Sequence, residues 1–186
     1  FDSNATTDPG TTVNVAHVDG PNTASDTMSG GTYWFHLRAC DNAGTCSEAQ
    51  HSGPYRIDAS APSNPSSLAS TSHTISEFSN DPSITMAWSG AGDDSGSGVA
   101  GYSVVVDETS NTQIDTSIEV PHIDGTSVHN WTSSDLGNGN SYYFHLRTCD
   151  AAGACSATVH RGPFMIDVSP PTDPSEVSSS SHETGT

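Results

Sequence analysis

The feature that most constrains this chain is an internal repeat. Residues 31–58 read GTYWFHLRACDNAGTCSEAQHSGPYRID, and residues 140–167 read NSYYFHLRTCDAAGACSATVHRGPFMID. The two segments are offset by 109 residues, the separation of Cys40 from Cys149, and the match continues into the proline-rich segments that follow them. Self-similarity at a fixed period indicates a duplicated structural unit. We therefore expect the natural polypeptide to continue as further copies.

The register of the repeat predicts three parts. Residues 1–58 correspond to the C-terminal part of one repeat, and residues 59–167 to a complete repeat. Residues 168–186 correspond to a linker and the start of a third repeat. Proline fixes one backbone dihedral, so the Pro-containing linkers predict a semi-rigid array.

Short segments with alternating apolar residues predict an all-β fold. Tyr142, Phe144 and Leu146 fall on one face of a strand, and no segment shows a helical period. Many short strands at intervals of about 8–15 residues favour an antiparallel β-sandwich. The seven strands expected in the complete repeat are 67–72, 84–88, 101–106, 118–122, 126–131, 142–149 and 158–166.

Several residues in this order resemble the fibronectin type III family and its bacterial immunoglobulin-like relatives. Trp88 matches the core tryptophan of that family, and Tyr102 matches the tyrosine of its third strand. Leu136 followed by Tyr142 matches its tyrosine corner. The resemblance implies tandem seven-stranded antiparallel sandwiches in a large extracellular surface or filament protein. It implies little about a ligand, because one sandwich serves many functions.

The four cysteines form two equally spaced pairs at the ends of a predicted hairpin turn. Cys40 and Cys46, and Cys149 and Cys155, are each six positions apart and close enough for disulfides. Free thiols, or a zinc site built from one pair and a histidine, are the alternatives. Two disulfides would place the chain in an oxidising compartment, so we expect an extracellular or cell-surface location.

The charge is strongly negative and excludes several classes of partner. The chain has 22 acidic residues against 4 basic ones, all four of them arginine, and a formal charge of −18. Nucleic acids and anionic membrane surfaces require cationic partners. No apolar segment approaches the roughly 20 residues of a membrane helix, so direct membrane insertion is not expected.

Acidic residues predict a calcium site at the junction of two repeats. Asp93 and Asp94 lie in a Gly/Ser-rich loop, Asp150 lies in the loop after the sixth strand, and Asp58 ends the preceding repeat. In a fibronectin-like sandwich these positions meet at one pole, where carboxylates could bind Ca²⁺. The alternative is that they are turn-forming residues, which aspartate favours for backbone reasons.

No pattern in the sequence indicates an enzyme. The chain has no GxSxG elbow, HExxH motif or glycine-rich phosphate loop. His36 and His145 repeat on what alternation predicts to be an outward strand face, so we expect exposed side chains.

Outward aromatic residues are candidates for contact with a protein or a sugar. Trp34 and Tyr143 occupy equivalent positions on the sixth strand, and Trp131 ends the fifth. An exposed aromatic strip marks an interface or a sugar-stacking surface, and packing beneath a loop is the alternative. Asn4 and Asn130 begin glycosylation sequons.

We therefore expect a structural or adhesive tandem repeat of an extracellular fibre, stalk or filament. Its partners would be neighbouring repeats of the same polypeptide and other copies of itself. Calcium at the junctions is the one cofactor expected. The alternative is a carbohydrate-binding accessory module of a secreted glycoside hydrolase.

Overall fold

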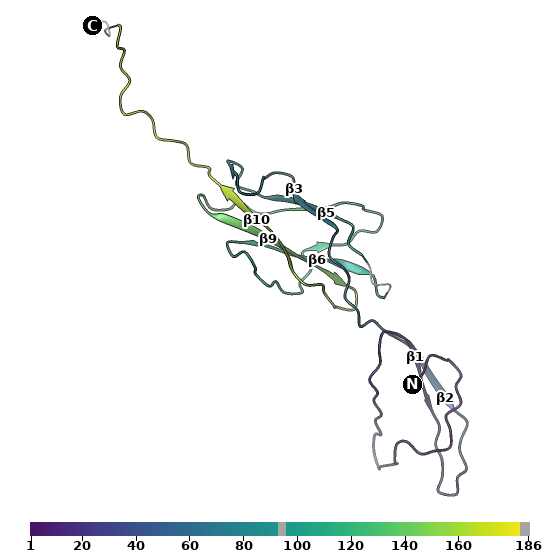
Figure 1. Cartoon of the computed structure of the whole chain (residues 1–186). Coiled ribbons are helices and arrows are strands. Elements are labelled where there is room, and N and C mark those ends of the chain that lie inside the picture. Colours follow the sequence, from purple (N-terminus) through teal and green to yellow (C-terminus); the bar gives the residue numbers. More distant parts are fainter. Residues whose placement is uncertain (93–95, 183–186) are drawn as a thin grey trace.

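The computed structural model describes residues 1–92 and 96–182, and within these ranges the chain is all-β with no helix. Figure 1 shows the small sheet of β1 and β2 at one end, the larger body in the middle, and residues 168–182 extending away from it. The strands are β1 Gly31–Leu37, β2 Gln50–Ile57, β3 Ser67–Ser70, β4 Phe78–Ser79, β5 Thr85–Ser89, β6 Val99–Asp107, β7 Val120–Pro121, β8 His129–Thr132, β9 Ser141–Asp150 and β10 Val159–Ile166.

The central body consists of two sheets with a shared core. One sheet has the order β4-β10-β9-β6-β7, and the other has the order β3-β5-β8. All neighbouring strands are antiparallel except β4 and β10, which are parallel. The arrangement fits a β-sandwich, in which the inner faces of two sheets bury alternate residues.

Both sheets contribute large apolar side chains to one core. Ile84 and Met86, from β5 and the residue before it, are fully buried opposite Phe144 and Leu146 of β9. Trp88 is 1% exposed, and its ring lies edge-on to the Tyr102 ring with the centroids 5.1 Å apart. Aromatic side chains of this size dominate the burial energy of a small core.

The tyrosine corner expected from the sequence is present. Tyr142 is 6% exposed, and its hydroxyl donates to the carbonyl oxygen of Gly137 at 3.1 Å. Leu136 packs against the core beside it, and its backbone N–H donates to the carbonyl of Pro82. The bond fixes the loop before β9 to the strand that follows it.

Each predicted strand range contains a strand, but the sheets differ in detail from a seven-stranded sandwich. The predicted strand at 118–122 is reduced to the two-residue β7, which hydrogen-bonds only to the start of β6. The short strand β4 was not predicted, because Phe78 and Ser79 show no alternation to identify it. It adds an edge beside Met165 and Ile166 of β10.

The segment before the sandwich repeats the β9–β10 hairpin. β1 and β2 pair antiparallel, with a shift in register between Tyr33 and Phe35, and β9 and β10 pair with a shift between Arg161 and Phe164. Each hairpin contains a cis Gly–Pro bond, at Gly53-Pro54 and at Gly162-Pro163. The side chains of β1 and β2 are half-buried or exposed, since in the described part of the chain no second sheet lies over them.

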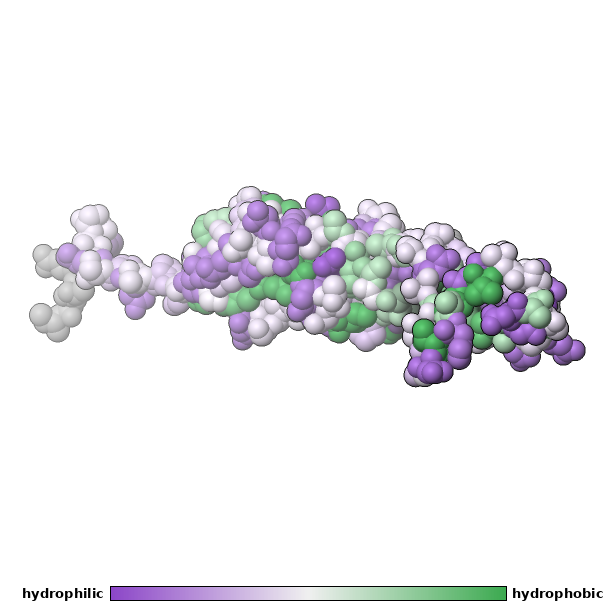
Figure 2. Space-filling view, turned by 90° about the horizontal axis from the view of Figure 1, so that it is seen from below, coloured by the Kyte–Doolittle hydropathy of each residue, from purple (hydrophilic) through white to green (hydrophobic). Residues whose placement is uncertain are grey.

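The surface is mixed in character. Figure 2 shows hydrophilic residues spread along the visible face, with apolar residues forming an interrupted band between them. Among the described residues, no helix has the length and apolar content needed to cross a membrane.

Candidate functional site

The best-defined polar site is the junction between the two-stranded unit and the sandwich. The linker that follows β2 is hydrogen-bonded to the loop that follows β5. Ser63 N–H donates to the Gly92 carbonyl at 3.0 Å, and Gly92 N–H donates to Ser63 Oγ at 2.9 Å. Ser66 N–H donates to the Gly90 carbonyl at 3.3 Å. The linker is therefore attached to the sandwich by its backbone as well as by its side chains.

Glycines make this close approach possible. A β-carbon at Gly92 would overlap Ser63 Oγ, and one at Gly90 would overlap Ser66 Oγ. Gly90 also has a positive φ of 72°, which favours glycine. The sequence indicated only a Gly/Ser-rich loop at these positions, whereas in the structure the absence of side chains lets the linker pack against the loop.

The carboxylate of Asp58 is bound at the same junction by Gly96 and Ser97, which we call the Asp58 socket. Ser97 N–H donates to Asp58 Oδ2 at 2.6 Å, and Ser60 N–H donates to Oδ1 at 3.2 Å. A β-carbon on Gly96 would overlap the carboxylate. Hydrogen bonds from the Ser97 side chain, then the Ser97 and Ser60 backbones, lower the pKa of Asp58. The last residue of the N-terminal unit is thus held by the sandwich.

A second contact joins the linker to the disulfide turn. The Asn64 side chain donates to the Ala157 carbonyl at 2.6 Å and accepts a hydrogen bond from Ser156 Oγ, also at 2.6 Å. Ser156 is 8% exposed, and its Oγ accepts the Thr148 N–H at 2.9 Å. The linker is therefore connected through two side chains to β9.

The calcium site predicted at this junction stays a prediction. Asp93 and Asp94 lie outside the described residues. Asp150 is 2% exposed, and its Oδ1 accepts the Ala154 N–H at 2.8 Å within its own turn, while Oδ2 has no hydrogen-bond partner among residues 1–92 and 96–182. Within the described residues, no three or more His, Cys, Asp or Glu side chains are grouped to hold a metal ion.

Both predicted disulfides are present. Cys40–Cys46 and Cys149–Cys155 have Cα–Cα distances of 4.0 Å and 4.1 Å, and neither pair leaves a free thiol. Each closes the turn between the two strands of its hairpin, which excludes the thiol and zinc alternatives. The disulfides indicate formation in an oxidising compartment.

Arg147 attaches the Cys149–Cys155 turn to the sheet. Its guanidinium donates to the carbonyls of Ser156 and Cys155, at 3.0 Å and 3.3 Å. It also donates to the carbonyl of Ile114 at 3.1 Å. Ile114 is 6% exposed and lies in the segment after β6, so that segment covers the outer face of the five-stranded sheet.

This covering segment makes the prediction of an exposed His145 wrong. His145 is fully buried, and its Nε2 lies 3.1 Å from Asp107 Oδ1, while its Nδ1 lies 2.7 Å from His160 Nδ1. A carboxylate only accepts, so His145 Nε2 carries a proton, and in the neutral imidazole Nδ1 then accepts from His160. Strand alternation placed His145 correctly on the outer face but could not show what lies over that face.

The same three residue types recur in the N-terminal unit. His36 Nε2 lies 3.1 Å from Asp2 Oδ1, and His36 Nδ1 lies 2.8 Å from His51 Nδ1. His36 is half-buried, with its side chain 5% exposed, so the exposure predicted for it is also wrong. Sequence reasoning missed this Asp–His–His chain. The histidines align at the repeat offset, but Asp2 and Asp107 do not.

Packing around the hydrogen-bonded side chains of Asp107, His145 and His160 shifts the pKa of two of them. Burial, then the neighbouring His145, lowers the pKa of His160, against the opposing effect of Asp107. Burial alone would raise the pKa of Asp107, but hydrogen bonds from Thr112, the Thr109 backbone and His145 outweigh it and lower the pKa. The two lowered pKa values therefore favour a neutral His160 beside an ionised Asp107 at neutral pH.

The three aromatic candidates are half-buried and take part in packing. An added methyl group at Gly53 would come within 2.8 Å of Trp34 Cδ1, and one at Gly162 within 2.8 Å of Tyr143 Cδ1. These two rings therefore lie against the cis Gly–Pro positions of the hairpins. The Trp131 ring packs on Phe144, with centroids 5.8 Å apart. Each of the three residues keeps part of its surface exposed.

The two sequon asparagines are both exposed. Asn130 lies on β8, and Asn4 lies in the turn before the two-stranded sheet. Asn4 Oδ1 accepts the Thr6 N–H at 3.3 Å. Glycosylation at these positions stays a prediction.

Comparison with known proteins gives one informative similarity. No protein-family model matches the chain. The chain is similar to Chitinase A1 of Niallia circulans, with 33% identity over 141 residues. The matched region is 73% of this chain but 17% of that protein. The chain therefore resembles one segment of a much longer polypeptide.

Proposed function

We propose that this chain is a non-catalytic accessory segment of a secreted protein that acts on a polysaccharide. The observation that carries the proposal is the similarity over 141 residues to part of Chitinase A1. The shortness of the match relative to that protein supports a segment beside a catalytic domain. This was the alternative in the sequence analysis, and it now has better support than a fibre or filament.

The geometry supports two roles for such a segment. The tandem repeat and the hydrogen-bonded linker suit a spacer that holds other domains apart at a defined distance. The half-buried rings of Trp34, Tyr143 and Trp131 suit contact with a sugar, whose apolar ring face stacks on aromatic side chains. The two roles are compatible, because the linker and the rings are different parts of the chain.

Binding to insoluble polysaccharide tests the sugar-contact role. The chain is mixed with chitin and, separately, cellulose, and the fraction left in solution is measured. We expect binding to chitin, and an affinity loss of at least about tenfold, or ~1.4 kcal/mol, for Trp34→Ala. Phe78→Ala is the matched control, because it removes an aromatic side chain 65% exposed outside the three candidates.

Two results would contradict the proposal at different points. Equal retention of the parent chain and Trp34→Ala on chitin would remove Trp34 from the contact, and Tyr143→Ala and Trp131→Ala would then be measured in the same way. A natural polypeptide that contains only copies of this repeat, with no catalytic domain, would refute the accessory role itself.

A structural fibre or stalk is the second candidate. The observation that favours it is the linker, where Ser63, Ser66 and Asn64 are all hydrogen-bonded to the following sandwich. A fibre requires such fixed junctions along its whole length, whereas a sugar-binding module does not. Sequencing the gene on both sides of the chain separates the two, because a fibre predicts many repeats of the same period.

A further inference from the structure

Asp58 and Asp167 are equivalent residues with the same local geometry. Each follows the last strand of its hairpin, and they are separated by the repeat offset. Asp58 Oδ1 accepts the N–H two residues ahead, at Ser60, over 3.2 Å. Asp167 Oδ1 accepts the N–H two residues ahead, at Ser169, over 3.1 Å. In both residues the second carboxylate oxygen is left for another partner.

The second oxygen of Asp58 shows what that partner is. Asp58 Oδ2 accepts the Ser97 N–H, and the carboxylate lies against Gly96 in the Asp58 socket. The socket belongs to the sandwich that follows Asp58 in the chain. A backbone N–H and a glycine are thus enough to form a small binding site for a carboxylate.

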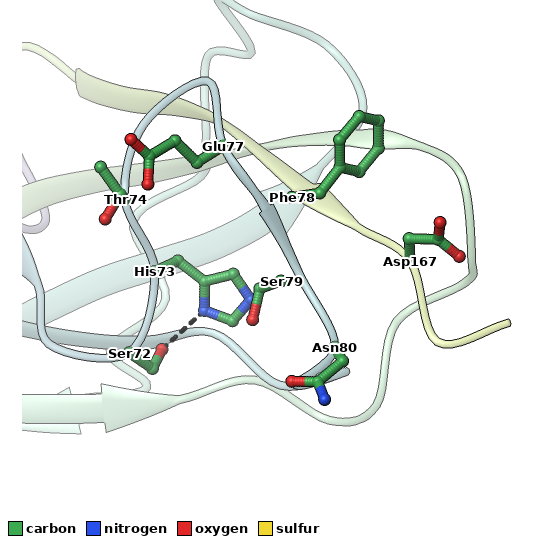
Figure 3. A pocket seen from close by; sticks show the side chains of 8 residues that line it. All are labelled: Ser72, His73, Thr74, Glu77, Phe78, Ser79, Asn80 and Asp167. Atoms are coloured by element: carbon green, nitrogen blue, oxygen red, sulfur yellow. Dashed lines mark hydrogen bonds between the residues drawn. The ribbon is translucent and has the colours of Figure 1, made fainter. Parts of the chain in front are cut away.

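Asp167 has its second oxygen open at the other pole of the sandwich. Among the described residues, Asp167 Oδ2 has no hydrogen-bond partner. It lies at the edge of a cavity of about 500 Å³ that is formed with the 72–80 loop (Figure 3). His73 holds this loop in place, since its Nδ1 lies 2.8 Å from Ser72 Oγ and its Nε2 lies 3.1 Å from the Asp81 carbonyl.

The segment after Asp167 keeps the chemistry of the linker that seats on Gly90 and Gly92. Thr172 stands where Ser63 stands in the first linker, and Ser175 stands where Ser66 stands. The hydroxyl that accepts the Gly92 N–H is therefore kept at the first position, while at the second Ser66 bonds the loop through its backbone N–H, which Ser175 also carries. Beside Asp167, the Phe78 ring is 65% exposed on the same pole.

We propose that this C-terminal pole, Asp167 with the 72–80 loop, is a docking surface for another copy of the same repeat. The Asp167 carboxylate enters the Gly–Ser socket of that copy, as Asp58 enters Gly96 and Ser97. The partner is thus another repeat of the same type. The part of it that binds Asp167 is a glycine followed by a residue whose backbone N–H can donate to the carboxylate. The proposal does not depend on sugar binding.

The test uses the full chain, alone and extended. Thr186 corresponds to Glu77 at the repeat offset, so adding a copy of residues 78–167 after Thr186 completes a third repeat. Nitrogen-15 relaxation reports the tumbling of each repeat. We expect the central and added repeats to share one rotational correlation time. We also expect the amide proton of the added serine that corresponds to Ser97 to shift downfield, because it would donate a hydrogen bond to the Asp167 carboxylate.

Matched variants separate the two junctions. Asp167→Ala should split the shared correlation time of the central and added repeats and abolish the serine shift, with the first junction unchanged. Asp58→Ala should do the reverse. An alanine at the added glycine that corresponds to Gly96 should reproduce Asp167→Ala by closing the socket.

Two outcomes would overturn the proposal. In the first, Asp167→Ala and the added alanine leave the second junction unchanged while Asp58→Ala loosens the first, so Asp167 does not act as Asp58 does. In the second, Asp58→Ala also has no effect, so the socket does not hold repeats together. Loss of sugar binding, or its absence, would leave both measurements unaffected.

Discussion

Replacing His145 by phenylalanine isolates the energetic role of the Asp–His–His chain. Phenylalanine keeps an aromatic ring beside His160, whose ring centroid lies 4.9 Å from that of His145. It removes both hydrogen-bonding nitrogens, which lie 3.1 Å from Asp107 Oδ1 and 2.7 Å from His160 Nδ1. The substitution therefore changes hydrogen bonding with little change in the shape of a fully buried side chain.

The expected cost follows from which groups lose a partner. Asp107 Oδ1 keeps the Thr109 N–H at 2.7 Å, and Oδ2 keeps the Thr112 hydroxyl at 2.7 Å, so the carboxylate stays satisfied. His160 Nδ1 loses its acceptor, and leaving this donor of a half-buried side chain unsatisfied costs about 1–3 kcal/mol. We expect a free energy of unfolding about 2 kcal/mol lower, which for a domain near 100 residues is about 8–16 °C in Tm.

Urea and thermal unfolding of the full chain, followed by tryptophan fluorescence, measure this loss. His36→Phe is the matched control, because it makes the same change in the two-stranded unit and should leave the unfolding of the sandwich unchanged. A loss below about 0.5 kcal/mol for His145→Phe, or a gain, would refute the reasoning. It would mean that the hydrogen bonds of His145 to Asp107 and His160 stabilise the fold no more than an apolar ring does.

Three further predictions concern pH, the disulfide and the glycine loop. Burial lowers the pKa of His129 and His160, so the unfolded chain binds more protons than the folded chain below the ordinary histidine pKa of 6.5. Stability should therefore fall as pH decreases through 6.5, and urea titrations at pH 7.5 and pH 5.5 that give equal free energies would contradict this. Replacing Cys149 and Cys155 together by serine should lower the free energy of unfolding by about 2 kcal/mol, the low end for a short loop, as measured by urea denaturation beside the same change at Cys40 and Cys46. Gly92→Ala should force Ser63 away and weaken the junction, with a cost of about 1–3 kcal/mol from overpacking. Faster hydrogen exchange at Ser63 and Gly92 would report the opening. The control Gly10→Ala changes a glycine whose added β-carbon would meet no described heavy atom within 4 Å and whose φ is not positive.

Much of the fold could be predicted because its signals are local. Ile84, Met86 and Trp88 alternate along the chain, and their inward direction follows from the twofold period of a strand. The cysteine pairs are also local, since six residues separate each pair at a turn. Because the chain contains two copies of the hairpin segment, the cysteine spacing could be seen twice.

The rest depends on segments that meet far apart in sequence. His145 alternates outward, and nothing near it in the sequence shows that Ile114 and its neighbours cover that face. Gly90, Gly92 and Gly96 are identified in the sequence only as part of a Gly/Ser-rich loop, because a single sequence shows only that the side chain is absent. The structure shows what occupies the space, which is the linker from residues 58 to 66.

The Asp58 socket also affects how an array of these repeats can change in length. The carboxylate belongs to one repeat and the glycine to the next, and under the proposal above each copy carries one half of each of two such joints. Any copy can then follow any other, because no joint requires residues that are specific to one pair of neighbours. Recombination that removes or adds whole periods would preserve every joint, so the number of repeats is free to vary while the spacing between neighbours is conserved.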